Sequence, residues 1–252
     1  MVRSLLVRGM LVGTVAGLLC FCFLKVYGEP QVDQAIAFET QQKEAKAAAE
    51  KTNGMAMPAA DEPELVSRGV QAGVGLFVAV LVYSTAFGGL FGLAYAFAYG
   101  RFPAALTPQA LSALLAVTGF IAIYLVPNLK YPANPPAVGN PDTIGIRTTL
   151  YFIMIAVSLV AMVATVRLKR WLVPRFGTWN AMLIAAACYI ILVAIAGFLL
   201  PVVNEVPDAF PAVVLWRFRV ASMGAQLITW ATIGLLFGAL TQRASARGRL
   251  FA

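Results

Sequence analysis

Five acidic residues lie close to the ends of long apolar segments, and their type is suited to binding a divalent cation. Carboxylate and carbonyl oxygens are the ligands that hard divalent cations prefer. Because the chain has no histidine, we expect such a site to bind weakly and with little selectivity, which a transit site tolerates. The candidate metal ligands are Glu29, Asp33, Asp142, Glu205 and Asp208.

The same acids also admit a structural interpretation, because basic residues open the neighbouring helices. Ion pairs between the two sets would hold the loops together, and both interpretations hold if a metal ion displaces an arginine. Met55 and Met57 are either soft ligands for the same ion or ordinary linker residues. The basic residues concerned are Arg68, Lys130, Arg147, Arg217 and Arg219.

Several other chemistries are excluded by the motifs that the sequence lacks. There is no phosphate-binding Gly-x-x-x-x-Gly-Lys-Ser/Thr segment, no Gly-x-Gly-x-x-Gly segment after a strand, and no histidine for a catalytic triad or a zinc site. Cys20, Cys22 and Cys188 lie in apolar segments, at spacings that match neither a disulfide framework nor a metal site. We therefore expect neither an enzyme nor a permanently bound cofactor.

The elements that position the acids are expected to be transmembrane helices. Hydrophobic residues make up 60% of the 252 residues and charged residues 12%, whereas a soluble domain carries roughly 25% charged residues. A helix needs about 20 apolar residues to cross a bilayer, and Pro127 and Pro201 are expected to end the third and fifth spans. The prediction is an all-α transmembrane bundle of about six spans, near 5–24, 70–99, 109–127, 148–166, 179–200 and 219–240.

The chain is expected to form one transmembrane domain over residues 1–252, with an inserted extracytoplasmic loop at 28–66. That loop begins with a polar helix that reaches about Lys51. A second loop, 128–147, is too rich in proline for a regular helix, and such backbone is tolerated at membrane depth only against protein or water. No carboxylate lies inside a predicted span, so the energy-coupling groups of a self-contained pump are not visible.

The distribution of charge orients the chain. Ten basic residues fall on the side of the termini and nine on the other side, so the lysine and arginine rule is nearly balanced. All eleven acidic residues fall opposite the termini. We therefore expect both termini in the cytoplasm, with a basic face towards membrane lipid. Nucleic acid is not expected as a partner, because the positive charges are scattered at span ends.

Glycines recur at intervals of four within three predicted spans. Gly9, Gly13 and Gly17 lie in the first span, and Gly88/Gly92 and Gly234/Gly238 repeat the spacing in the second and sixth. Small residues at this interval let two helix backbones approach closely. The glycines are expected to pack helices within the chain or to present a face to a partner subunit.

Four segments together resemble a known family. They are Gly-Glu-Pro-Gln-Val-Asp-Gln-Ala-Ile-Ala-Phe-Glu at 28–39, Glu-Leu-Val-Ser-Arg-Gly-Val-Gln at 64–71, Lys-Tyr-Pro-Ala-Asn-Pro-Pro-Ala-Val-Gly-Asn-Pro-Asp-Thr-Ile at 130–144, and Asn-Glu-Val-Pro-Asp-Ala-Phe-Pro with Leu-Trp-Arg-Phe-Arg within 204–219. They resemble the CbtA family of probable cobalt transporter subunits. The resemblance covers nearly the whole chain except about 42–61.

The resemblance implies a multi-pass subunit for Co²⁺ uptake in the bacterial inner membrane. It also implies a small CbtB-like partner subunit and a link to cobalamin synthesis. Members of the family are often described with five spans and a histidine-rich first outer loop, whereas this chain reads as six spans and has no histidine. The alternative interpretation is a membrane scaffold or assembly partner that transports nothing.

Overall fold

The computed structural model describes residues 1–52, 66–101 and 106–248, and these residues form helices and connecting loops without a strand. The chain divides into two compact units, each described by itself. Unit 1 comprises Met1–Ala116, Asn134–Val138 and Pro207–Ala252, and unit 2 comprises Val117–Ala133 and Gly139–Val206. The expectation of one domain over 1–252 stays a prediction.

The helical membrane architecture is confirmed, with a span count close to the expected six. Five helical segments of the described chain are long and apolar enough to cross a membrane. The predicted runs 148–166 and 179–200 fall on one helix, α7 (Ile144–Leu199), which is interrupted at Gly177. The five segments are Val2–Ala49, Arg68–Ala98, Pro108–Lys130, Pro141–Leu199 and Ala212–Ala246.

In unit 1, α1 (Val2–Phe23) packs closely against α4 (Leu76–Ala98) through their glycines. A Cβ atom added at Gly9 would lie 2.1 Å from the carbonyl oxygen of Gly88, and one at Gly13 would lie 2.2 Å from that of Ser84. One added at Gly92 would lie 2.5 Å from the carbonyl oxygen of Leu5. The two backbones are therefore in direct contact, which explains the spacing of these glycines.

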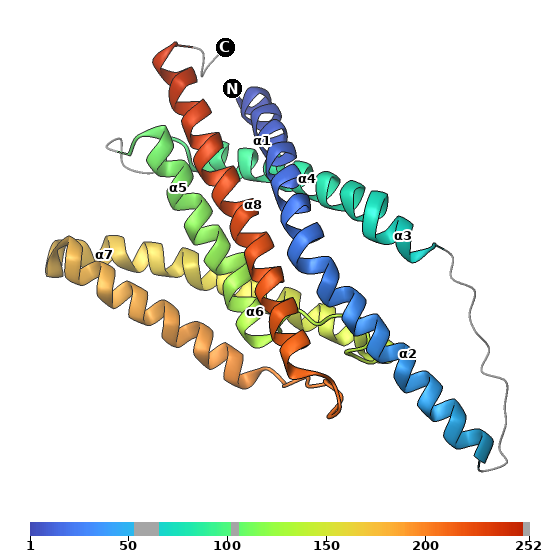
Figure 1. The fold of residues 1–252 in the computed structure, drawn as a ribbon. Helices are drawn as coiled ribbons and strands as arrows, with labels where there is room; N and C mark the ends of the chain where they lie inside the picture. The colour runs from blue at the N-terminus through green and yellow to red at the C-terminus, as the bar shows by residue number, and fades with distance from the viewer. Residues whose placement is uncertain (53–65, 102–105, 249–252) are drawn as a thin grey trace. The chain divides into compact units, whose positions relative to one another are not determined.

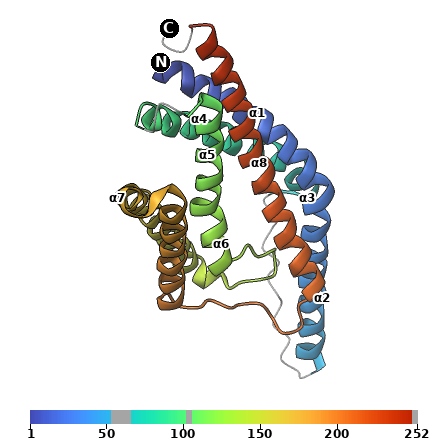
Figure 2. The ribbon, with the colours of Figure 1, turned by 90° about the vertical axis from the view of Figure 1, so that its left-hand side faces the viewer.

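The glycine pair of α8 (Ala212–Ala246) packs in the same way against α5 (Pro108–Gly119). A Cβ atom at Gly234 would lie 2.4 Å from that of Ala116, and one at Gly238 would lie 3.0 Å from that of Ser112. The Ser112 hydroxyl donates a hydrogen bond of 2.7 Å to the Gly234 carbonyl oxygen. Figures 1 and 2 show α8 beside α1, with the amino end of α1 and the carboxyl end of α8 at the same end of unit 1.

The first span does not stop at the membrane boundary expected from the sequence. A five-residue π-helical turn, η1 (Leu24–Gly28), joins α1 to the polar helix α2 (Glu29–Thr52) in one helical segment. The Glu29 N–H bonds to the carbonyl oxygen five residues earlier, on Leu24, and Pro30 follows directly. The wider turn accommodates Pro30, which has no N–H and would strike the carbonyl of a regular turn.

A second π-helical turn explains why Pro127 lies inside a helix instead of ending it. The turn η3 (Phe120–Leu125) follows α5 and leads into α6 (Val126–Lys130), with the Val126 N–H bonded to the Ile121 carbonyl oxygen. Helical backbone continues past Pro127 to Lys130. The expectation that Pro127 ends the third span was therefore wrong by one turn, because the wide turn again precedes the proline.

Unit 2 is built on the two arms of α7, and Figure 1 shows that the chain doubles back within this helix. Gly177 has φ 73° and ψ 167°, a backbone conformation that a residue with a Cβ atom rarely adopts. The Ser158 and Tyr189 hydroxyls, one on each arm, are 2.7 Å apart and share a hydrogen bond. Met154 and Ala161 of the first arm pack with Tyr189 and with Val126 of α6.

Candidate functional site

In unit 1 two of the predicted metal ligands, Glu29 and Asp33, meet Arg68. The Arg68 guanidinium donates to Asp33 Oδ1 from Nε at 3.1 Å and from Nη2 at 2.9 Å. Nη2 also donates to Glu29 Oε2. We call these three residues the Arg68 cluster.

Helix geometry explains why the cluster forms. Glu29 and Asp33 are four residues apart on α2, so both side chains lie on one face. Ser67 has extended backbone and caps the start of the short helix α3 (Arg68–Val70), with its carbonyl oxygen bonded by the Val70 and Gln71 N–H groups. Arg68 is therefore the first helical residue of the returning chain.

A lysine makes a further link one turn closer to α1. Lys25, in η1, donates from Nζ to the Ala72 carbonyl oxygen at 2.9 Å. Ala72 belongs to the π-helical turn η2 (Gln71–Gly75), which joins α3 to α4. Lys25, Glu29 and Asp33 thus follow one another along the chain, and all three bind the segment that begins with Arg68.

The Arg68 cluster has more negative than positive charge. Two carboxylates share one guanidinium, and in the described part of the chain each reaches it through a single oxygen. The Asp33 side chain is 62% exposed, whereas that of Glu29 is 11% exposed. One carboxylate oxygen of each residue can therefore accept a further cation, and Asp33 offers the accessible one.

Glu205 in unit 2 has a different environment. Its Oε1 accepts a hydrogen bond from the Thr143 hydroxyl, and its Oε2 accepts one of 2.7 Å from the Asn140 N–H. Arg147 Nε lies 3.5 Å from Oε2, close enough for an ion pair. We call Asn140, Thr143, Arg147 and Glu205 the Glu205 cluster.

The local sequence of the proline-rich loop builds most of this cluster. Asn140 caps the short 3₁₀ helix η4 (Pro141–Thr143), and its Oδ1 accepts the Asp142 N–H at 3.0 Å. Gly139 has φ 120°, and a Cβ atom there would lie 2.4 Å from Arg147 Nη1. Glycine is therefore required for the Arg147 guanidinium to lie against this turn.

The environment of Glu205 favours its ionised form. The hydrogen bond from the Thr143 hydroxyl contributes most to lowering the pKa of Glu205 from its usual value, followed by the hydrogen bond from the Asn140 N–H. Burial raises the pKa in part, and the charge of Arg147 lowers it by a smaller amount. Both oxygens are engaged and the side chain is 15% exposed. The Glu205 cluster therefore resembles a structural ion pair more than an open ligand.

Two further bonds tie loop residues to helix ends. In unit 1, Arg219 of α8 donates from Nη2 to Asn134 Oδ1 at 3.0 Å. In unit 2, the Tyr131 hydroxyl donates to the Pro201 carbonyl oxygen at 2.9 Å. Lys130 lies over the Tyr131 ring, 5.7 Å from its centroid. The basic residues near the acids thus have several kinds of partner.

The remaining predicted ligands, Asp142 and Asp208, are exposed. In the ranges 1–52, 66–101 and 106–248, no group of three or more histidine, cysteine, aspartate or glutamate residues comes together as a metal site. Met55 and Met57, the candidate soft ligands, lie outside the described residues. The binding of metal by the five acids therefore stays a prediction.

Sequence reasoning did not identify Lys25, Asn140 or Thr143 as members of these clusters. The Asn140-Pro141-Asp142-Thr143 segment carries a usable signal, since asparagine before a proline that opens a helical turn is a typical cap. Lys25 carries no such signal, because its partner is a backbone carbonyl 47 residues away.

Comparison with known proteins identifies a family. The family model described as "Probable cobalt transporter subunit (CbtA)" matches residues 2–242. No curated protein and no solved structure matches the chain.

Proposed function

This chain belongs to the CbtA family of probable cobalt transporter subunits, and we propose that its Arg68 cluster receives the divalent cation on the outer side of the membrane. The chain is a multi-pass membrane subunit, with five helical segments able to span a bilayer. Membership of a transporter as a subunit implies partner subunits.

The observation that carries the proposal is the charge of the cluster. Glu29 and Asp33 share the single guanidinium of Arg68. A divalent cation beside two carboxylates gains more electrostatic energy than a monovalent guanidinium at the same distance. Co²⁺ accepts oxygen ligands although it also binds nitrogen and sulfur. The cation therefore competes with Arg68 for the carboxylates, and water or a partner subunit completes its coordination.

The other three acids have secondary roles in this proposal. Glu205 stabilises the loops of unit 2 through Thr143 and Arg147. Asp142 and Asp208 are exposed, and they attract cations without holding one between them. Capture at two carboxylates is weak and reversible, which suits an ion that must be released again. Co²⁺ is thus the cargo of the protein and not a resident cofactor.

The orientation of the chain follows from its acids. All eleven lie between residues 29 and 208, and six predicted spans, with the two arms of α7 counted separately, put them opposite the termini. We place this side outside the bacterial inner membrane and both termini in the cytoplasm, so the Arg68 cluster faces the source of the metal. Uptake then requires the partner machinery, including a small CbtB-like subunit, because the predicted spans carry no carboxylate.

Metal accumulation tests the function directly. Cells that lack their own cobalt uptake should accumulate Co²⁺ when they express this chain together with its small partner subunit, and should not when they express either alone. A scaffold that transports nothing leaves accumulation unchanged in all three strains, although the complex assembles. Outside-only labelling of a cysteine introduced at the exposed position 178, beside Gly177, should fail if the orientation is correct.

A further inference from the structure

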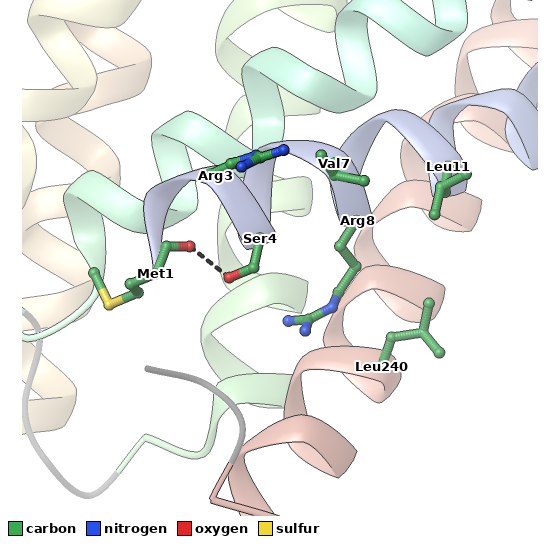
Figure 3. A pocket seen from close by; sticks show the side chains of 7 residues that line it. All are labelled: Met1, Arg3, Ser4, Val7, Arg8, Leu11 and Leu240. Atoms are coloured by element: carbon green, nitrogen blue, oxygen red, sulfur yellow. Dashed lines mark hydrogen bonds between the residues drawn. The ribbon is translucent and has the colours of Figure 1, made fainter. Parts of the chain in front are cut away.

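A groove runs along the first three turns of α1 at the end of unit 1 where α1 begins and α8 ends. Its volume is about 730 Å³, and Figure 3 shows Arg8 extending from α1 towards α8. Five lining residues belong to α1, one precedes it as the N-cap, and one belongs to α8. They are Met1, Arg3, Ser4, Val7, Arg8, Leu11 and Leu240.

The lining combines two arginines with an apolar strip. Val7 and Leu11 are one helical turn apart on the same face, and the two residues are 47% and 64% exposed. Arg3 precedes Val7 by four residues and lies on the same face of α1, whereas Arg8 follows Val7 directly and extends towards α8. Arg8 is held in place, because Nη1 donates to the hydroxyl of the buried Thr241 at 3.2 Å.

The charge of this region is positive only. Neither residues 1–28 nor residues 209–252, which include α1 and α8, contain aspartate or glutamate. The arginines of the groove therefore have no acidic side chain from these segments to neutralise them. Positive charge at the end of a span, beside exposed apolar side chains, favours a ligand that is anionic at one end and apolar along its length.

We propose that this groove binds one anionic phospholipid. Its phosphate accepts hydrogen bonds from Arg3 and Arg8, and an acyl chain lies along Val7, Leu11 and Leu240. A free phosphate ion would engage the arginines and leave the apolar strip in contact with the bulk lipid. A bound phospholipid contacts both the arginines and the apolar strip. It also links the beginning of α1 to the end of α8, because Arg8 binds Thr241 of α8.

Native mass spectrometry of the purified full chain tests this site. Phosphatidylglycerol and phosphatidylcholine with identical acyl chains are titrated separately, and binding of the first lipid molecule is compared. The wild type should prefer phosphatidylglycerol. Arg3→Gln and Arg8→Gln should each weaken its binding by about fivefold, the effect of removing one arginine near a lipid surface, with little change for phosphatidylcholine. Leu11→Ser should weaken both lipids.

Matched controls separate a site from a general basic surface. Arg243→Gln and Arg247→Gln remove charge from the last turn and carboxyl end of α8 without altering the groove lining, so they should retain the preference. An equal loss in all four arginine variants, or no preference in the wild type, overturns the proposal. Displacement of the lipid by inorganic phosphate at millimolar concentration would also overturn it. Arg3→Gln leaves the hydrogen bond between Arg8 and Thr241 intact. A loss of lipid binding in this variant therefore does not come from a broken contact between α1 and α8.

Discussion

The Arg68 cluster and the Glu205 cluster each pair an acid with an arginine near the start of a helix, but they differ in the balance of charge. In the first, two carboxylates share one guanidinium, and Asp33 is 62% exposed. In the second, one carboxylate receives hydrogen bonds from Thr143 and Asn140 and an ion-pair contact from Arg147. An arginine that opens a helix beside an acid is thus ambiguous in sequence. A carboxylate with hydrogen-bond donors on both oxygens is a structural contact, whereas one with a free oxygen can still bind a metal ion.

The largest effect should come from separating the two helical segments, Val2–Ala49 and Arg68–Ala98, that carry the Arg68 cluster. Gly88→Leu places a side chain against the α1 backbone, where even a Cβ atom would lie 2.2 Å from the Gly9 carbonyl oxygen. We expect a loss of stability at or above the about 1–3 kcal/mol usual for overpacking. Detergent-solubilised protein should therefore elute as aggregate in size-exclusion chromatography.

Gly197→Ala is the matched control for this prediction. Gly197 lies in α7 with no atom within 4 Å of an added Cβ, and alanine is the better helix former. The variant should elute as the wild type does. Normal elution of Gly88→Leu would mean that α1 and α4 are not in contact at this glycine.

Removing the arginine should change metal binding at only one of the two clusters. Arg68→Gln frees two carboxylates from a competing charge, so Co²⁺ should bind more tightly, by about thirtyfold. That factor follows from about 1 kcal/mol for two unit charges 4 Å apart in water, doubled for a divalent ion. Arg147→Gln should leave Co²⁺ affinity unchanged. Isothermal titration of the purified variants measures both, and equal effects would contradict the distinction.

Neutralising Glu205 should lower stability with no effect on metal. Glu205→Gln keeps the shape of the side chain but removes the negative charge that pairs with Arg147 and strengthens the hydrogen bonds from Thr143 and Asn140. The melting temperature should fall by a few degrees. Asp208→Asn, at an exposed acid, should melt as the wild type does.

The smallest expected effect is the pH dependence of the same contact. The folded protein holds the pKa of Glu205 below its usual value, so the stabilisation is complete above the unfolded pKa of about 4.3 and is lost as pH falls through the folded value. The melting temperature of the wild type should therefore drop more than that of Glu205→Gln from about pH 5 downwards. Parallel curves would show that Glu205 is not held in its ionised form.

The helical membrane architecture was predictable because it depends on composition and run length. The glycine spacing also predicted close helix packing, which the α1–α4 and α5–α8 contacts confirm. Both signals are local, since each is read within a window of about 20 residues. They require no knowledge of which segments meet in space.

The helix boundaries at Pro30 and Pro127 were harder to predict. Each proline follows a π-helical turn in which an N–H bonds five residues back. The usual reading of proline as a helix end assumes regular turns. A reversal between the spans 148–166 and 179–200 was expected, but its position at Gly177 was not, because Arg175 and Phe176 continue the helix up to a residue with positive φ.

The pairing of acids with arginines was not predictable in detail. Arg68 binds acids 35 and 39 residues earlier, whereas Arg147 pairs with Glu205, 58 residues later. Sequence spacing restricts neighbours on one helix, as for Glu29 and Asp33. It does not determine which loops meet. The sequence alone therefore did not show which acids bind metal and which form structural ion pairs.

Cobalt uptake per molecule, measured for Asp33→Asn and Glu205→Gln side by side with the membrane abundance of each, tests the central distinction most directly. We predict that Asp33→Asn is as abundant as the wild type but loses most of its uptake. Glu205→Gln should be less abundant, with unchanged uptake per molecule. Normal uptake in Asp33→Asn, together with lost uptake per molecule in Glu205→Gln, would contradict the assignment of metal capture to the Arg68 cluster.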